Sequence, residues 1–363
     1  MTAICSRKIG FLVAFLMIGF SAQAKKEDVS LEVDKKAGVE ETTTSIIGVN
    51  HIGLSVKNLD RMLEFYLKAT EFELVSHVQV TSSKAVDTLF NNEGTAYRKA
   101  VLKAPNMLLE LTEFDSSRQQ EIQEMPVFGP GMTHTCYQTK ADKSGYEKFR
   151  SAGLKTLSRG GTVDLGGYGV TYAYGYDPEG NMLEMEQLDQ KILNRSGYDK
   201  TWKSVDHPMW MSQVALVSND LDRIMMFYQS VLGFKPFRTA ELRENKKVDD
   251  IVDIDDAHIK GGWFRLGKVT KVMEFWEFVN PITPTSSSPK SLQGLGYTFS
   301  LEVTDIKAEV KRLKALDIQF ASEPVLLDGF WQVFAWDVDG NPFQLRQAAD
   351  PNSDLSVTKL DIF

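Results

Sequence analysis

The sequence predicts an α+β fold built from four βαβββ modules that assemble in two pairs. The main observation is an internal duplication: HIGLSVKNLDRMLEFY at 51–66 reappears as QVALVSNDLDRIMMFY at 213–228. The turn sequence DPEGN at 177–181 likewise reappears as DVDGN at 337–341. A glycine next to asparagine in such a turn supplies the positive φ that a tight hairpin needs. Both signals fall at matching places in the two halves of the chain.

The first module can be followed element by element. A strand at 51–56 precedes Asn58, which is a suitable N-cap for a helix. The helix has one apolar face at i, i+3, i+4 and i+7, formed by Leu59, Met62, Leu63 and Tyr66. Three β-rich stretches follow near 71–80, 97–104 and 107–114.

The same pattern recurs within each half. His51 and His134 open equivalent strands 83 residues apart, and Gln213 and Thr298 open equivalent strands 85 residues apart. A single βαβββ module is too small to close its own sheet, so two modules must pair to bury one. Four modules therefore predict two paired domains.

The chain divides by composition into folded and unfolded parts. Residues 25–45 are polar and Thr-rich with little apolar periodicity, which is typical of a tether, and the fold should begin near Ile46. We expect a signal peptide at 1–24, a tether at 25–45, the first domain at 46–190, a linker at 191–206, the second domain at 207–348 and a tail at 349–363.

The N-terminus has the features of a secretory signal. Arg7 and Lys8 precede an apolar run at 9–20, and an A-x-A site ends at Ala24. The run is shorter than the ~20 residues that a membrane-spanning helix needs. We therefore expect a periplasmic or secreted protein with no membrane attachment after cleavage.

Charge and cysteine content narrow the class of partner. The formal net charge of the whole chain is −8, with 41 basic and 49 acidic side chains. Loss of Arg7 and Lys8 with the signal would leave 39 basic side chains and a net charge of −10. An acidic chain without a basic cluster is not expected to bind nucleic acid. Cys136 would be the only cysteine left, so no intrachain disulfide is expected, and we predict that Cys136 packs in the core.

Polar residues recur at one register position of the apolar strands. In the first half these are His51, Glu110, His134 and Glu184. A His or Glu on an apolar strand is costly to bury unless it is paired or bound to a cation. Two imidazoles and two carboxylates in register therefore predict a metal site. The corresponding residues of the second half are Gln213, Glu274, Thr298 and Gln344.

These motifs resemble the vicinal oxygen chelate superfamily, which includes glyoxalase I, methylmalonyl-CoA epimerase, extradiol dioxygenases and bleomycin-resistance proteins. The resemblance covers nearly all of residues 46–346 and rests on N-H-I-G-L-S-V with N-L-D-R-x-L-x-F-Y, on L-L-E-L-T and on D-P-E-G-N-x-x-E. It implies a U-shaped cup between two paired modules, with metal ligands from the first and fourth strands of each.

The resemblance implies one divalent ion bound by His51, Glu110, His134 and Glu184. That ligand mix suits Ni, Zn, Fe, Mn or Co and does not choose among them. The second half departs from the family pattern, because Thr298 and Gln344 are poor ligands for a divalent ion. Its site is therefore expected to be degenerate.

Module pairing decides which residues meet. We expect consecutive modules to pair, because this concentrates the four strongest ligands in one cup. If the second and third modules pair instead, the site becomes His134, Glu184, Gln213 and Glu274, which also resembles a glyoxalase ligand set. The connection at 115–131 permits either arrangement.

The resemblance favours an enzyme of the glyoxalase or epimerase kind, a lyase or isomerase that transfers a proton on a small oxygen-chelating substrate. Glu184 is the preferred general base and Glu110 the second choice, while Glu186 is expected to be a surface acid. One alternative is a metal-free small-molecule binding protein like the bleomycin-resistance proteins. Another is an extradiol-type dioxygenase, whose signature would need a further His that is missing from 166–176. The sequence does not indicate an oligomeric state.

Overall fold

The computed structural model describes residues 43–140, 144–167, 169–189, 191–193, 207–266, 271–286 and 289–360. The predicted signal peptide, most of the tether and residues 194–206 of the predicted linker lie outside this range. Within the described residues, no helix is both long enough and apolar enough to cross a membrane.

The chain forms four modules, at 46–114, 131–188, 209–280 and 296–348. The first contains β1 (Ile46–Ser55), α1 (Leu59–Thr70), β2 (Glu73–Val80), α2 (Lys84–Phe90), β3 (Tyr97–Lys103) and β4 (Leu108–Phe114), followed by a 3-10 turn at Ser117–Gln119. The second contains β5 (Gly131–Lys140), α3 (Gly145–Ala152), β6 (Lys155–Thr156), β7 (Val163–Asp164), β8 (Val170–Tyr176) and β9 (Met182–Leu188).

The third and fourth modules repeat this order. The third contains β10 (Met209–Met211), β11 (Gln213–Val217), α5 (Leu221–Leu232), β12 (Arg238–Leu242), α6 (Lys246–Val252), β13 (His258–Arg265) and β14 (Val272–Asn280). The fourth contains β15 (Gly296–Val303), α7 (Ile306–Lys314), β16 (Val325–Leu327), β17 (Phe330–Trp336) and β18 (Pro342–Ala348), and α8 (Val357–Leu360) follows it.

The predicted elements of the first module are confirmed. β1 begins at Ile46, and the Asn58 side chain accepts a hydrogen bond from the Arg61 backbone N–H at the start of α1. The short helices α2 and α6 were not predicted. Each lies between the second and third long strands of its module and has only two to four buried residues, too few for a clear periodic signal.

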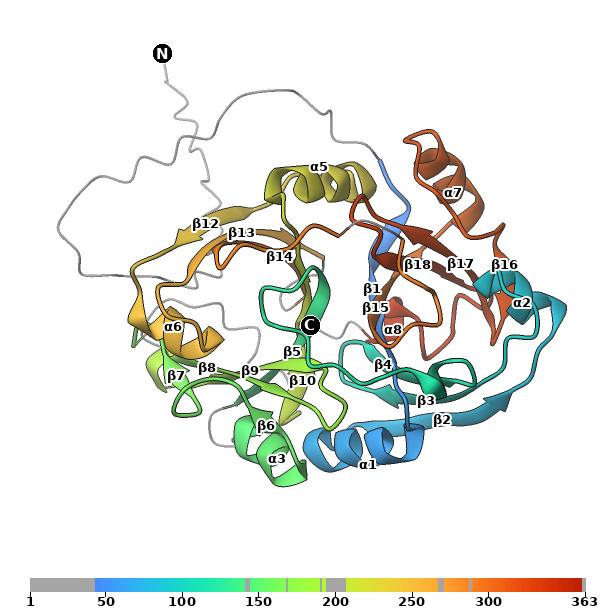
Figure 1. The fold of residues 1–363 in the computed structure, drawn as a ribbon. Helices are drawn as coiled ribbons and strands as arrows, with labels where there is room; N and C mark the ends of the chain where they lie inside the picture. The colour runs from blue at the N-terminus through green and yellow to red at the C-terminus, as the bar shows by residue number, and fades with distance from the viewer. Residues whose placement is uncertain are drawn as a thin grey trace, which may run out of the picture.

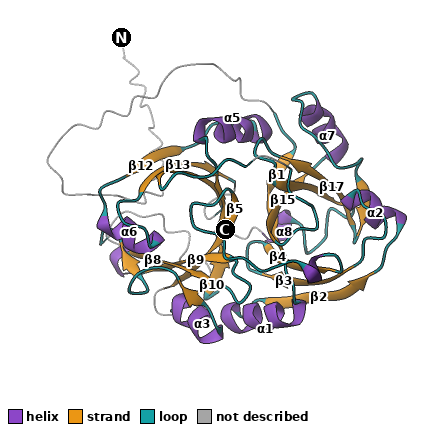
Figure 2. Cartoon of the chain, in the orientation of Figure 1, coloured by secondary structure: helices purple, strands orange, loops and turns teal. Residues whose placement is uncertain are grey.

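Two curled sheets form the molecule, and each makes a cup (Figures 1 and 2). One has the strand order β16-β17-β18-β15-β1-β4-β3-β2 and joins the first and fourth modules; we call its hollow the 1/4 cup. The other follows β12-β13-β14-β11-β5-β9-β8-β6 and joins the second and third modules; we call its hollow the 2/3 cup. The α+β fold of paired modules is thus confirmed.

The expectation that the first module pairs with the second, and the third with the fourth, is wrong. β1 pairs antiparallel with β15, and β5 pairs antiparallel with β11, so each sheet takes one module from each half of the sequence. The predicted domains at 46–190 and 207–348 therefore do not coincide with the two sheets.

The short strand β10 shows how the third module is attached to the second. Trp210 of β10 lies opposite Gln138 of β5, and β11 continues along the same strand after Ser212. Trp210 is fully buried and its indole N–H donates to the Gln138 side chain at 2.8 Å. The third module thus pairs with β5 from its first strand onward.

The first module contacts the second, and the third contacts the fourth, through a helix and a turn. The Tyr66 hydroxyl of α1 donates to Asp177 at 2.9 Å, and the Tyr228 hydroxyl of α5 donates to Asp337 at 3.0 Å. Both carboxylates belong to the repeated D-x-x-G-N turns, where each also accepts bonds from the turn itself. The duplicated motifs therefore hold the first module against the second and the third against the fourth. They do not determine which modules share a sheet.

The predicted tail at 349–363 is part of the fold as far as residue 360. The buried carboxylate of Glu302 accepts hydrogen bonds from the Ser356 hydroxyl at 2.6 Å, the Val357 backbone at 2.8 Å and the Asn50 side chain at 2.7 Å. Leu360 packs with Val101 and other apolar residues of the first module. The C-terminal segment thus contacts both modules of the 1/4 sheet.

Candidate metal centre

Four polar side chains line the 2/3 cup from four adjacent strands. His134 of β5 lies opposite Ala215 of β11, and Ala215 lies beside Glu274 of β14. Gln213 is two residues before Ala215, and Glu184 lies beside Cys136, two residues after His134. Side chains of laterally paired residues, and of residues two apart on one strand, share a face of the sheet. The strand register therefore brings these polar groups onto one concave surface.

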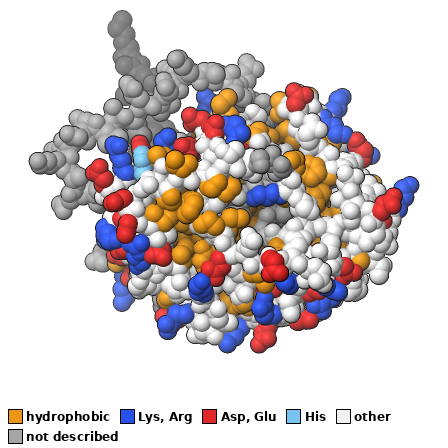
Figure 3. Space-filling model, in the orientation of Figure 1, with side chains coloured by type: hydrophobic (Ala, Val, Ile, Leu, Met, Phe, Trp, Pro, Cys, Tyr) orange, Lys and Arg blue, Asp and Glu red, His pale blue; other side chains and the backbone are white. Residues whose placement is uncertain are grey.

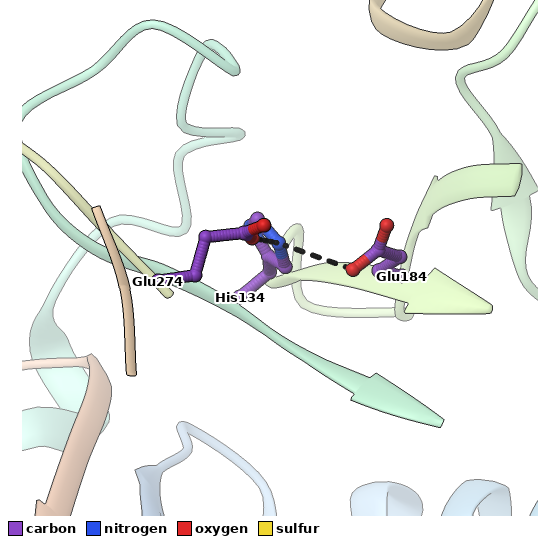
Figure 4. Close-up of side chains that lie close together, drawn as sticks. All are labelled: His134, Glu184 and Glu274. Atoms are coloured by element: carbon purple, nitrogen blue, oxygen red, sulfur yellow. Dashed lines mark ion pairs between the residues drawn. The ribbon is translucent and has the colours of Figure 1, made fainter. Parts of the chain in front are cut away.

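His134 lies between two carboxylates. Its Nε2 atom is 3.6 Å from Glu184 Oε2 and 3.6 Å from Glu274 Oε2, with the two acids approaching from opposite sides of the imidazole (Figure 4). All three residues are at most 5 % exposed. Nε2 is buried and has no hydrogen-bond partner among the described residues. The other ring nitrogen, Nδ1, is 3.0 Å from the Thr133 hydroxyl.

The Gln213 amide completes the cluster. Its oxygen faces the same two carboxylate oxygens, an arrangement in which acceptors meet acceptors. With the amide turned over, its nitrogen would lie 2.7 Å from Glu184 Oε2 and 3.2 Å from Glu274 Oε2. In the observed orientation a shared cation would satisfy all three oxygens.

The donor set fits a divalent ion. Two atoms bonded to one ion at about 2.1 Å are at most about 4.2 Å apart, and the 3.6 Å separations at His134 meet this limit. When Nδ1 carries the ring proton and donates to the Thr133 hydroxyl, Nε2 presents its lone pair to the cluster. His134, Glu184, Gln213 and Glu274 are therefore the residues that could hold a metal. Three of them, His134, Glu184 and Glu274, form a compact buried His/Glu/Glu cluster.

The electrostatics favour a cation. Within the described part of the chain, the ion pairs of Glu184 and Glu274 both go to His134. Burial alone would lower the pKa of His134, but the two carboxylates outweigh it and raise the pKa to about 9. Burial raises the pKa of Glu184, with His134 opposing this shift and Glu274 adding to it. The proton on His134 thus balances part of the negative charge of the buried Glu184 and Glu274 carboxylates. A bound metal ion would displace that proton.

The two carboxylates differ in how they are held. The indole N–H of Trp263 donates to Glu274 Oε1 at 2.7 Å, which leaves Oε2 directed at His134. Among the described residues, Glu184 receives no hydrogen bond of this kind. Glu274 is therefore anchored by a neighbouring strand through an indole bond that Glu184 lacks.

The wall of the 2/3 cup is mainly apolar. The hollow has an empty volume of about 670 Å³, which includes its part open to solvent. Hydrophobic side chains gather on the half of the molecular face that holds this cup (Figure 3). The apolar lining is contributed by strands β8 and β11–β14 and by helix α6, and includes Tyr172, Tyr174, Val217, Leu242, Val248, Ile251, Val252, Ile259, Trp263, Trp276 and Phe278. Arg238 also lines the cup, with its guanidinium 4.5 Å from the Trp263 ring centre.

The sequence analysis missed one buried acid of the 2/3 cup, in addition to Glu184 and Glu274. Glu186, expected at the surface, is 2 % exposed and lines the cup two residues beyond Glu184. Gln138 donates to it at 2.5 Å and in turn accepts from the Trp210 indole. Burial raises the pKa of Glu186 to about 8, and the charge of Glu184 adds to the shift. Its i+2 spacing from Glu184 already placed it on the same strand face. Cys136, on that face too, is fully buried as expected.

The structure does not bring together the four residues predicted as one metal site. His134 and Glu184 lie in the 2/3 cup, whereas His51 and Glu110 lie in the 1/4 cup with Thr298 and Gln344. The reason is the pairing of β1 with β15, which places Gly53 beside both Thr298 and Glu110. Glu110, the second choice for the general base, is therefore in a different cup from Glu184.

The two predicted ligands of the 1/4 cup have cationic neighbours. Lys99 Nζ and Arg346 Nη1 each lie 3.8 Å from Glu110 Oε2. Burial alone would raise the pKa of Glu110, but Lys99, His51 and Arg346 together lower it to about 2. Burial lowers the pKa of His51 to about 3, with Glu110 opposing and Arg346 and Lys99 adding to the shift. The protein itself supplies the positive charge here, so these residues do not fit a divalent ion.

The comparisons with known proteins agree with this architecture. Among solved structures, a glyoxalase I mutant from Zea mays has a TM-score of 0.58 and 20% identity, covering 86% of this chain and 96% of that chain. Glyoxalase I from Zea mays itself has a TM-score of 0.56 and 19% identity, covering 84% and 92%. A candidate dioxygenase from Bacillus subtilis has a TM-score of 0.53 and 10% identity, covering 88% and 92%. These identities show a shared fold alone.

The sequence comparisons give the family. No curated protein matches the sequence. The family model described as "Glyoxalase/Bleomycin resistance protein/Dioxygenase superfamily" matches twice, at residues 48–185 and 210–345. These two matches cover most of the chain and all four modules that build the cups. The chain therefore belongs to the glyoxalase/bleomycin resistance protein/dioxygenase superfamily.

Proposed function

We propose that this protein is a metal-dependent lyase or isomerase that transfers a proton on the carbon next to a carbonyl group of a small substrate. The metal would be held by His134, Glu184, Gln213 and Glu274. The observation that carries the proposal is the buried Nε2 of His134. Within the part of the chain that the structure describes, this atom has no hydrogen-bond partner and faces two carboxylates and an amide oxygen.

The donor set determines what kind of ion fits. One imidazole nitrogen with carboxylate and amide oxygens suits Ni, Zn, Fe, Mn or Co. When bound, such an ion supplies Lewis-acid polarisation of the substrate oxygens. This makes the neighbouring C–H more acidic and leaves the protein to provide a base.

Glu184 is the residue best placed to take the proton. Its carboxylate faces the cup and lacks the indole hydrogen bond that anchors Glu274. A general base must have a carboxylate oxygen within hydrogen-bond reach of the substrate proton, and Oε1 of Glu274 is already occupied by the Trp263 indole. Glu274 and His134 then act as the fixed part of the site.

The apolar wall defines the rest of the substrate. Trp276, Phe278 and Ile259 are among the side chains that surround the polar cluster, so a substrate with an apolar body would bury it there and exclude water. Small highly charged substrates do not match this lining. Arg238, at the same wall, is the cationic group that could reach an acidic substituent.

Export is part of the proposal and rests on the N-terminal sequence. The basic start, apolar run and A-x-A site of residues 1–24 support a periplasmic or secreted protein. N-terminal sequencing of the protein from its native host should begin at Lys25. A mature chain that begins at Met1 and remains inside the cell would contradict export without affecting the metal site.

Metal analysis of purified protein tests the site directly. The wild-type protein should carry about one divalent ion per chain, and His134→Ala should lose it. His51→Ala is the matched control, because His51 occupies the equivalent strand position in the other cup; it should retain the ion. Loss of metal in His51→Ala with retention in His134→Ala would refute the assignment.

Proton transfer can be tested separately. Incubation of metal-loaded protein with hydroxy-carbonyl compounds in deuterated water should incorporate deuterium at the carbon next to the carbonyl. Oxygen consumption with a catechol and no deuterium incorporation would instead indicate a dioxygenase.

The apolar cup also favours a second candidate, a protein that sequesters its ligand. Tight ligand binding without either reaction would support that function.

A further inference from the structure

We propose that the 1/4 cup is a second, metal-free binding site for an uncharged small molecule that carries neighbouring hydroxyl and carbonyl groups on an aromatic body. This proposal does not rest on the function proposed for the 2/3 cup. It follows from four observations at the base and the wall of the 1/4 cup.

The first observation is that protein cations surround the acid of the 1/4 cup. Lys99 and Arg346 each lie 3.8 Å from Glu110, and Lys99 also contacts Asp328 at 2.5 Å. Two positive and two negative side chains leave this part of the cup without net charge. Neither a divalent cation nor a highly charged anion gains from such surroundings.

The second observation concerns the tautomer of His51. Arg346 Nη1 lies 3.0 Å from His51 Nδ1, and a guanidinium can only donate. Asn50 Oδ1 also lies 3.0 Å from Nδ1, and Arg346 Nη1 lies 3.2 Å from that oxygen. With Nδ1 as an acceptor, Arg346 donates to both atoms, whereas a proton on Nδ1 would face the guanidinium. This arrangement favours the proton of the neutral imidazole on Nε2. At His134 the corresponding neighbour is a threonine hydroxyl, which can accept from Nδ1. His51 thus offers the 1/4 cup a hydrogen-bond donor where His134 can offer the 2/3 cup a lone pair.

The third observation is an unpaired acceptor in register with His51, since Ser300 lies beside both His51 and Gln344. Gln344 lines the cup and is 4 % exposed. Its nitrogen donates to Gln332 at 3.1 Å, whereas its buried oxygen has no hydrogen-bond partner in the described ranges of the chain. A buried unpaired acceptor costs about 1–3 kcal/mol. A ligand hydroxyl would satisfy the Gln344 oxygen while a ligand carbonyl accepts from His51.

The fourth observation is an aromatic wall. Phe90 packs against Tyr97, Phe114 and Phe334 with ring centres 5.6, 5.0 and 5.6 Å apart. All four residues line the cup. Aromatic rings favour offset or edge-to-face contact with another ring, which is worth about 0.5–1.5 kcal/mol beyond area burial. The wall therefore suits an aromatic body above the polar base.

Equilibrium dialysis with 2-hydroxyacetophenone as the probe tests the proposal. Full-length protein treated with a chelator should still bind one probe molecule per chain. Acetophenone, which lacks the hydroxyl, and benzoate, which is charged, should each bind at least about tenfold more weakly. Absence of probe binding to the metal-free protein, or equal binding of acetophenone, would overturn the proposal.

Two tryptophan substitutions assign the bound probe to a cup. Leu327 lines the 1/4 cup on the edge strand β16, and Leu242 lines the 2/3 cup on the edge strand β12. Leu327→Trp should abolish metal-free binding, whereas Leu242→Trp should keep it. Leu326→Trp, at an exposed position next to Leu327, is the matched control and should bind like wild type.

The reverse pattern would overturn the proposal, since it would place the metal-free probe in the 2/3 cup. These results are separable from the proposed enzyme function. Metal bound at the 2/3 cup with no metal-free probe binding would leave that function intact and refute only the second site.

Discussion

His134 Nε2 lies 3.6 Å from Glu274 Oε2, although the two residues come from different halves of the chain. The contact exists because β5 and β11 pair and β14 lies beside β11. Each half alone contains one part of the polar cluster and could not build it. The candidate metal centre is therefore a property of the assembled chain and not of one duplicated half.

Replacement of Glu184 by glutamine should separate metal binding from catalysis. The amide can still offer an oxygen to a metal ion but cannot accept a proton, so turnover should fall by about 10²-fold or more. Metal content measured on the same sample shows whether the ion is still present. Wild-type turnover in fully metal-loaded Glu184→Gln would exclude Glu184 as the base.

Loss of the indole hydrogen bond to Glu274 should weaken metal binding. Trp263→Phe removes the donor at 2.7 Å while keeping an aromatic ring, and loss of such a supporting bond typically costs about 10–100-fold in metal affinity. Trp276→Phe is a matched control, because the buried indole N–H of Trp276 has no hydrogen-bond partner among the residues that the structure describes. Affinity can be measured by competition with a chelator. An equal effect of both substitutions would show that ring packing, and not the hydrogen bond, matters.

His51 should make folding stability depend on pH. Burial lowers its pKa in the folded protein to about 3, from about 6.5 in an unfolded chain. Below pH 6.5 the unfolded chain binds a proton that the folded protein does not, so stability is lost as pH falls. Between pH 7 and pH 5 this single group should cost on the order of 2 kcal/mol.

The effect of His51 is isolated by denaturant titration of His51→Gln at both pH values. This variant should lose less stability between pH 7 and pH 5 than the wild type does. His77→Gln, which changes an exposed histidine of β2, should behave like the wild type. An unchanged pH dependence in His51→Gln would contradict the prediction.

The two helix-to-turn contacts should contribute equally to stability. Tyr66→Phe and Tyr228→Phe each remove a hydrogen bond to a buried carboxylate, Asp177 or Asp337. Each should lower the free energy of unfolding by about 1–3 kcal/mol, because the carboxylate loses a donor that water does not replace. Chemical denaturation of both variants gives the comparison. A large effect of only one substitution would show that the duplicated contacts have diverged.

The sequence predicted the modules because their elements are set by local signals. The Asn58 cap, the apolar face from Leu59 to Tyr66 and the start of β1 at Ile46 all depend on neighbouring residues and are found as expected. Register along each strand was also correct, since the recurring His and Glu side chains line the cups. These features need no knowledge of which modules meet.

Sheet pairing could not be predicted in the same way, because the first strands of all four modules carry equivalent patterns. Their edges are interchangeable as far as local hydrophobicity is concerned. Which modules share a sheet depends on long-range contacts, such as the hydrogen bond of the fully buried Trp210 to Gln138 of β5. The apolar triplet Met-Trp-Met at 209–211, separated from Gln213 by Ser212, was the available signal that the chain adds to an existing strand there.

The nested pairing brings the two ends of the described chain together. Gly48 is so close to Val357 that a Cβ atom added to the glycine would lie 3.2 Å from the valine side chain. Ser45 also bonds to Glu309 of α7, in the fourth module. A circular permutant that joins these ends through a short linker, with new termini within 194–206, would keep every strand neighbour of both cups. The order in which the two halves are synthesised is therefore expected to be exchangeable without loss of either cup.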